Sequence, residues 1–157
     1  MSALIAGDVS LLERELDRTI ELLLPMVEDL IQRLAPDQIV TSEVDEWGYV
    51  TSAPVRFTDG VGSGRAVAQL FRYRDMVRID VELDHNRKLA HADGSPSERR
   101  CFLNDYVASV MLAPGSERLP DDFRRTVLRG MKGALDAVRR HNRKHSEPWH
   151  QIRVTAG

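Results

Sequence analysis

Residues 76–84 read MVRIDVELD, and after Met76 every second residue is apolar while the residues between them are charged. A period of two places the apolar side chains on one face of a β-strand and the charged ones on the other. Such a strand is typical of a sheet that covers a core on one side only. Residues 65–74 have the composition of an antiparallel partner strand, with a tight turn near Asp75.

Three shorter segments upstream also have strand character. They are Ile39–Val44, Trp47–Thr51 and Val55–Thr58. No stretch long enough for a crossover helix separates these segments, so we expect an antiparallel meander of four to five strands. We expect the aromatic residues Phe71 and Tyr73 to belong to the core.

A long amphipathic helix is predicted before the sheet, over residues 11–34. Ser10 and Glu13 have the spacing of a capping box at its start. Apolar residues then recur every three or four positions, at Leu12, Leu16, Ile20, Leu23, Val27, Leu30 and Leu34. Pro25 predicts a kink near residues 21–25 rather than a break, because the apolar stripe continues in phase.

Two helices are predicted after the sheet. The first covers residues 97–112, where apolar residues recur at helical spacing after a polar loop at 85–94, although the same stretch also alternates as a strand does. The second follows Pro120 and has an apolar stripe of Phe123, Val127, Met131, Leu135 and Val138. The tail at 149–154 suits an added edge strand. We therefore predict a single α+β domain over residues 1–157.

Composition places the chain among ordinary globular proteins, with 42% hydrophobic and 29% charged residues. The longest apolar stretch is far shorter than the roughly 20 residues of a membrane span, so no membrane association is expected. The N-terminus does not have the pattern of a signal peptide. The only cysteine, Cys101, excludes an internal disulfide. We expect a cytoplasmic protein.

The charge is divided unevenly along the chain. Residues 1–63 hold four arginines and twelve acids, and residues 64–157 hold eighteen Lys and Arg and twelve acids, giving net charges of −8 and +6. This asymmetry indicates an anionic partner for the second half, or attraction between the halves of one chain or of two copies.

The last predicted helix carries a basic face opposite its apolar stripe. That face comprises Arg125, Arg129, Lys132, Arg139, Arg140 and Arg143. Such a face can neutralise phosphates, which makes nucleic-acid binding one hypothesis. The alternative is a solvated face that lies opposite the acids of the first helix.

Two further groups of residues contain side chains that can bind metal ions. His141 and His145 are one helical turn apart, but the cations around them oppose a divalent metal. Asp80, Glu82 and Asp84 share one strand face, which is also the appearance of a solvated strand. Both patterns therefore favour a structural reading over a metal site.

Small residues cluster on one side of the last helix, at Gly130, Gly133, Ala134 and Ala137. Each glycine costs roughly 1 kcal/mol of helix propensity relative to alanine. We therefore expect another backbone to approach there, from the first helix or from a second subunit.

The chain has no nucleophile elbow, no paired cysteines, no His-Glu-x-x-His motif and no phosphate-loop lysine. We therefore favour a non-enzymatic protein-interaction module of the adaptor, chaperone-like or inhibitor kind, a homodimer with a protein partner and without a cofactor. The alternatives are a nucleic-acid-binding accessory protein that uses the basic helix face, and a metal-dependent hydrolase.

Overall fold

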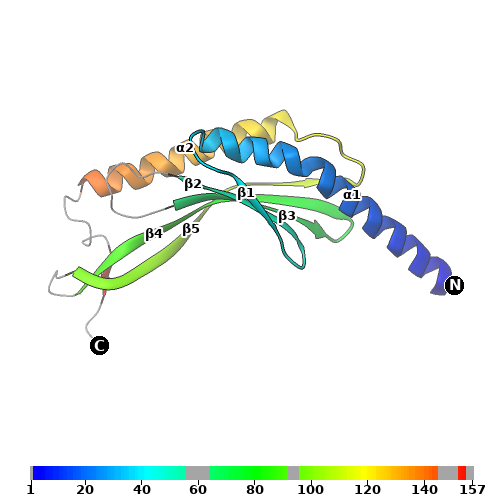
Figure 1. Ribbon diagram of the computed structural model, residues 1–157, viewed down its shortest axis with the longest axis horizontal. Coiled ribbons are helices and arrows are strands. Elements are labelled where there is room, and N and C mark those ends of the chain that lie inside the picture. The colour runs from blue at the N-terminus through cyan, green and yellow to red at the C-terminus, as the bar shows by residue number, and fades with distance from the viewer. Residues whose placement is uncertain (1, 56–63, 92–95, 145–151, 155–157) are drawn as a thin grey trace.

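The computed structural model describes residues 2–55, 64–91, 96–144 and 152–154. Its elements follow the order α1 (Ser2–Leu34), β1 (Thr41–Val44), β2 (Gly48–Val55), β3 (Gly64–Tyr73), β4 (Met76–His91), β5 (Pro96–Leu112), α2 (Asp121–Lys144) and β6 (Ile152–Val154). Strands β1 to β5 form an antiparallel sheet in sequence order, and the short β6 pairs in parallel with β4. Both helices lie on the same side of this sheet, so within the described residues its other face has no helix over it (Figure 1). The α+β architecture and the meander are confirmed.

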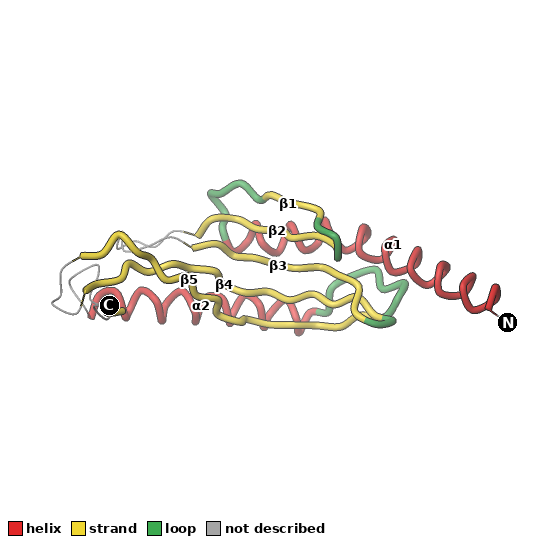
Figure 2. The backbone as a smooth tube through the Cα atoms, turned by 90° about the horizontal axis from the view of Figure 1, so that it is seen from below, coloured by secondary structure: helices red, strands yellow, loops and turns green. Residues whose placement is uncertain are grey.

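The core lies between the sheet and the two helices, as the sequence predicts. Six of the described apolar side chains of α1 are buried, namely Leu16, Ile20, Leu23, Val27, Leu30 and Ile31. They face the inward residues of the central strands, such as Leu70, Ile79 and Val81. α1 packs mainly on β2 and β3, whereas α2 packs mainly on β5. Figure 2 shows the two helices side by side behind different strands.

α1 is longer than expected, and its predicted capping box is wrong. The helix begins at Ser2, so Ser10 lies inside it rather than at its start. The Ser10 hydroxyl accepts a hydrogen bond from the Arg14 guanidinium at 3.4 Å instead of capping an amide. The helix continues through Pro25, which is exposed, and its axis bends as it passes over the sheet (Figure 1).

β2 joins two strands that the sequence separates at Pro54. The register pairs Pro54 with Arg65 on β3, and the last residue of β2 that pairs with β1 is Ser52. Pro54 therefore lies where β2 has no neighbour on its β1 side, a position at which the missing proline N–H is tolerated. Part of the predicted strand Val55–Thr58, residues 56–58, lies outside the described residues.

The predicted helix at 97–112 is wrong, because this segment is strand β5. It pairs with β4 from Val77 opposite Leu112 to Ala90 opposite Pro96. The predicted loop at 85–94 is likewise strand as far as His91. A β-bulge leaves Val107 between Tyr106 and Ala108 without a partner on β4. Because the bulge adds one residue to β5, the inward-facing residues before and after it are no longer an even number of positions apart. The spacing of the apolar residues then resembles that of a helix. One helix therefore follows the sheet in the described chain, not two.

α2 begins at Asp121, as predicted, and buries Phe123, Val127 and Met131. Gly130 explains part of the small-residue cluster, because a Cβ at this position would lie 3.0 Å from Cγ1 of Val107. Within this chain, the neighbour of Gly130 is therefore Val107 in the bulge of β5, whose carbonyl oxygen lies 3.5 Å from the same Cβ position, and not α1. Gly133 has no such neighbour, since nothing lies within 4 Å of its ideal Cβ position.

Thr19 of α1 is buried and forms a hydrogen bond with the turn before α2. Its hydroxyl donates to the Glu15 carbonyl at 2.8 Å and accepts from the Gly115 amide at 2.9 Å. Gly115 has a φ of 86°, a conformation that glycine adopts without strain.

In the described part of the chain, neither helix is long and apolar enough to cross a membrane.

Candidate binding surface

Trp47 is a large apolar side chain that is exposed in the turn between β1 and β2. Two thirds of its surface (66%) is open to solvent. The turn is rigid because one carboxylate oxygen of Asp45 accepts from the amides of Trp47 at 2.8 Å and Gly48 at 2.7 Å. The Asp45 amide also donates to the Gly48 carbonyl at 2.9 Å. Trp47 is therefore presented on an ordered backbone rather than on a loose loop.

Gly48 brings this turn into close contact with β3. It pairs with Phe71, and a Cβ at Gly48 would lie 1.9 Å from the Leu70 carbonyl oxygen. Atoms cannot approach so closely, so the backbone has this geometry only with glycine at residue 48. The consequence is that Trp47 is held against the end of β3.

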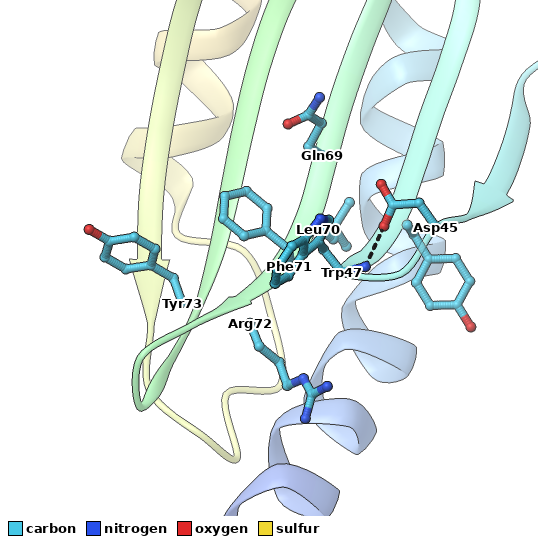
Figure 3. A pocket seen from close by; sticks show the side chains of 8 residues that line it. Asp45, Trp47, Gln69, Leu70, Phe71, Arg72 and Tyr73 are labelled. Atoms are coloured by element: carbon cyan, nitrogen blue, oxygen red, sulfur yellow. Dashed lines mark hydrogen bonds between the residues drawn. The ribbon is translucent and has the colours of Figure 1, made fainter.

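A pocket of about 350 Å³ lies at this end of the sheet (Figure 3). It is lined by Asp45, Trp47, Tyr49, Gln69, Leu70, Phe71, Arg72 and Tyr73. We call Trp47, Gln69, Phe71, Arg72 and Tyr73 the Trp47 surface. Small pockets with aromatic walls and a few polar groups are typical binding sites.

Phe71 and Tyr73 are half-buried on the uncovered face of β3, so their predicted place in the core is wrong. Their rings pack edge to face, 6.5 Å apart at 87°. The Arg78 guanidinium stacks over both rings, 6.0 Å from Phe71 and 5.2 Å from Tyr73, and it bonds to Asp80 at 2.9 Å. The aromatic rings are thus fixed by neighbours and do not need to reorganise when a partner binds.

Arg74 contributes a strained backbone next to this surface. Its φ of 57° lies in the left-handed region, which disfavours residues other than glycine, asparagine and aspartate. Its guanidinium lies 5.6 Å from the centre of the Tyr73 ring. Arg74 is the first residue of the two-residue turn between β3 and β4, and tight hairpin turns require a positive φ, so the hairpin accounts for this conformation.

A second hollow, of about 220 Å³, lies between α1 and the Trp47 turn. Four acids are among its lining residues, namely Asp17, Glu21, Asp45 and Glu46. Its one lining cation is Arg72, whose guanidinium lies 3.5 Å from Asp17 and 3.6 Å from Glu13. Figure 3 shows Arg72 extending toward α1. This hollow is therefore predominantly acidic, whereas Arg74 and Arg78 lie over the aromatic rings of the Trp47 surface.

The basic residues singled out from the sequence lie elsewhere, on α2. Arg125, Arg129 and Lys132 are exposed and follow one another at intervals of four and three residues, which places them on one side of the helix. We call these three residues the α2 row. Leu128, exposed by 36%, lies among them. The Arg125 guanidinium bonds to Asp122. The side chains of Arg139, Arg140 and Arg143 lie outside the described part of the structure.

The acids Asp80, Glu82 and Asp84 share the uncovered face of β4, as the sequence indicates. Burial raises the pKa of Glu82, and the nearby Asp84 raises it further. Burial also raises the pKa of Asp84. Among the described residues, no three His, Cys, Asp or Glu side chains are grouped so as to hold a metal. The His141 side chain, His145 and the Cys101 side chain lie outside the described part.

One pair of possible catalytic groups was not foreseen from the sequence. His85 Nε2 lies 2.9 Å from a carboxylate oxygen of Asp105, across β4 and β5. A carboxylate can orient an imidazole for proton transfer. However, the His85 side chain is only 1% exposed, so a substrate has little access to it. This burial favours a structural role.

Trp47 was also missed as a site, since the sequence reading placed it at the start of a strand. The available signal is the run Asp45-Glu46-Trp47-Gly48, which puts the largest apolar side chain into a polar turn.

No family model, curated protein or solved structure matches this chain.

Proposed function

We propose that this protein is a non-enzymatic protein-interaction module, cytoplasmic and homodimeric, that binds protein through the Trp47 surface. The observation that supports this most directly is Trp47, an exposed tryptophan on a turn ordered by Asp45 and packed beside Phe71 and Arg72. Tryptophan, tyrosine and arginine dominate the binding energy of protein interfaces. A rigid aromatic group loses little conformational entropy on binding, which favours affinity.

The test compares Trp47→Ala with Ile39→Ala. Ile39 is a matched control because it is 80% exposed and does not line the pockets around Trp47. We expect Trp47→Ala to weaken protein binding by about 2 kcal/mol or more, roughly thirtyfold in Kd, with the melting temperature nearly unchanged. Ile39→Ala should bind as the wild type does.

Binding can be followed by the fluorescence of Trp47. The chain has two tryptophans, so Trp149→Phe leaves Trp47 as the only one. We expect its emission to shift to shorter wavelength when a partner covers the pocket. If Trp47→Ala changed neither self-association nor the capture of other proteins, this function would have to be abandoned.

The second candidate function is nucleic-acid binding by the α2 row. The observation that favours it is the exposure of Arg125, Arg129 and Lys132 along one side of α2. Such binding weakens steeply as salt is added. Titration of single- and double-stranded oligonucleotides at several salt concentrations tests it. Salt-dependent binding that disappears when the three residues are changed to alanine would support this candidate over the first.

A further inference from the structure

The acidic and basic surfaces of this chain are too far apart to neutralise each other. The Trp47 turn lies at the β1 edge of the sheet, and α2 packs mainly on β5 at the opposite edge. Four strand intervals of about 4.8 Å separate these edges, a distance of about 19 Å. On the helix side of the sheet, α1 lies behind β1 and β2 and α2 lies behind β4 and β5 (Figure 2).

The acids of α1 do not neutralise the α2 row either. In the described part of the chain, the ion pairs that α1 makes with the sheet join Glu13 and Asp17 to Arg72 of β3. α1 and α2 themselves touch only slightly. Among the described residues, the α2 row is solvated and no ion pair joins it to an acid of α1.

The two surfaces are complementary in chemistry. The Trp47 surface offers an apolar pocket beside a hollow with four acids. The α2 row offers three cations around the exposed apolar side chain of Leu128. Leu128 suits the apolar pocket, and the cations beside Leu128 suit the four acids of the neighbouring hollow and the face of Trp47, because ion pairs and cation–π contacts then support the apolar contact.

From this complementarity we propose that the partner at the Trp47 surface is the α2 row of a second copy of this chain. The contact forms twice about a two-fold axis, because each copy carries both surfaces. The inference rests on the proposed function, since it names the occupant of the same site.

The test reverses charges on each surface separately. One variant, the turn variant, carries Glu21→Lys and Glu46→Lys at the acidic hollow, and the other, the helix variant, carries Arg129→Glu and Lys132→Glu. All four side chains are exposed, so the fold should tolerate the changes. The control carries Asp37→Lys and Arg118→Glu, which are exposed and line neither the Trp47 pocket nor the acidic hollow.

Sedimentation velocity at low and high salt measures the result. We expect the wild type and the control to dimerise, more weakly at high salt, and each variant alone to have its dimer Kd raised by about tenfold or more. An equimolar mixture of the two variants should dimerise again. Its lysine turn then meets the glutamate row, and the unaltered surfaces form the second contact.

Three outcomes would overturn the inference. They are a wild type that is monomeric at every concentration, dimers that neither variant weakens, and a mixture that does not restore the dimer. The proposed function is judged separately. A monomeric wild type that captures another protein only when Trp47 is present would retain protein binding through the Trp47 surface, and it would exclude both the homodimer and the second copy as the occupant.

Discussion

The close packing of the Trp47 turn can be tested by one substitution, Gly48→Ala. The added methyl group would lie 1.9 Å from the Leu70 carbonyl oxygen, which is backbone and cannot rotate away. β2 and β3 must therefore separate locally at the Gly48–Phe71 pair. Overpacking of this kind costs about 1–3 kcal/mol, which lowers the melting temperature of a chain of this size by roughly 2–12 °C.

The matched control is the same substitution at Gly133. Gly133 lies in α2, is exposed, and has nothing within 4 Å of its ideal Cβ position. Gly133→Ala should therefore stabilise the protein by about 0.5–1 kcal/mol through helix propensity alone. Thermal and urea denaturation followed by circular dichroism measure both variants. A Gly48→Ala protein as stable as the wild type would show that the turn does not approach β3 as described.

Two other predictions concern α1 and the strand acids. Leu23→Ala removes a fully buried side chain and should cost about 2–5 kcal/mol in urea denaturation, whereas Glu13→Ala removes one exposed ion pair with Arg72 and should cost less than about 1 kcal/mol. Equal losses would mean that the apolar stripe of α1 has been misassigned. Glu82→Gln should raise the melting temperature at neutral pH. Because the pKa of Glu82 is higher in the folded protein, its contribution to stability is greatest below the ordinary pKa of glutamate and is lost as the pH rises through the folded value. The gain should therefore shrink toward acidic pH, and a gain independent of pH would contradict this account.

The fold could be predicted where a periodic pattern coincided with the period of the element. The alternation at 76–84 and the stripe of residues 12–34 both led to correct elements, because burial on one side selects those periods. The predicted helix at 97–112 failed because a bulge at Val107 breaks the alternation, and no local pattern reports a bulge. Residues 97–112 form a strand because they pair with β4 over most of the length of β5.

The candidate site could be predicted only in part. The basic residues of α2 were found because helical projection depends on the sequence alone. The Trp47 surface was not found, because its residues come from the β1–β2 turn and from the end of β3, and only the β2–β3 register brings them together.

Local periodicity and composition were enough to predict the α+β class, the long first helix, the meander and the opposite charges of the two halves. The tertiary structure decided that β5 is a strand, that Val107 of the same chain occupies the space beside Gly130, and that the acidic and basic surfaces lie at opposite edges of the sheet. These features depend on contacts between residues far apart in the chain. Their free energies arise from pairing and packing, which a pattern along one segment does not contain.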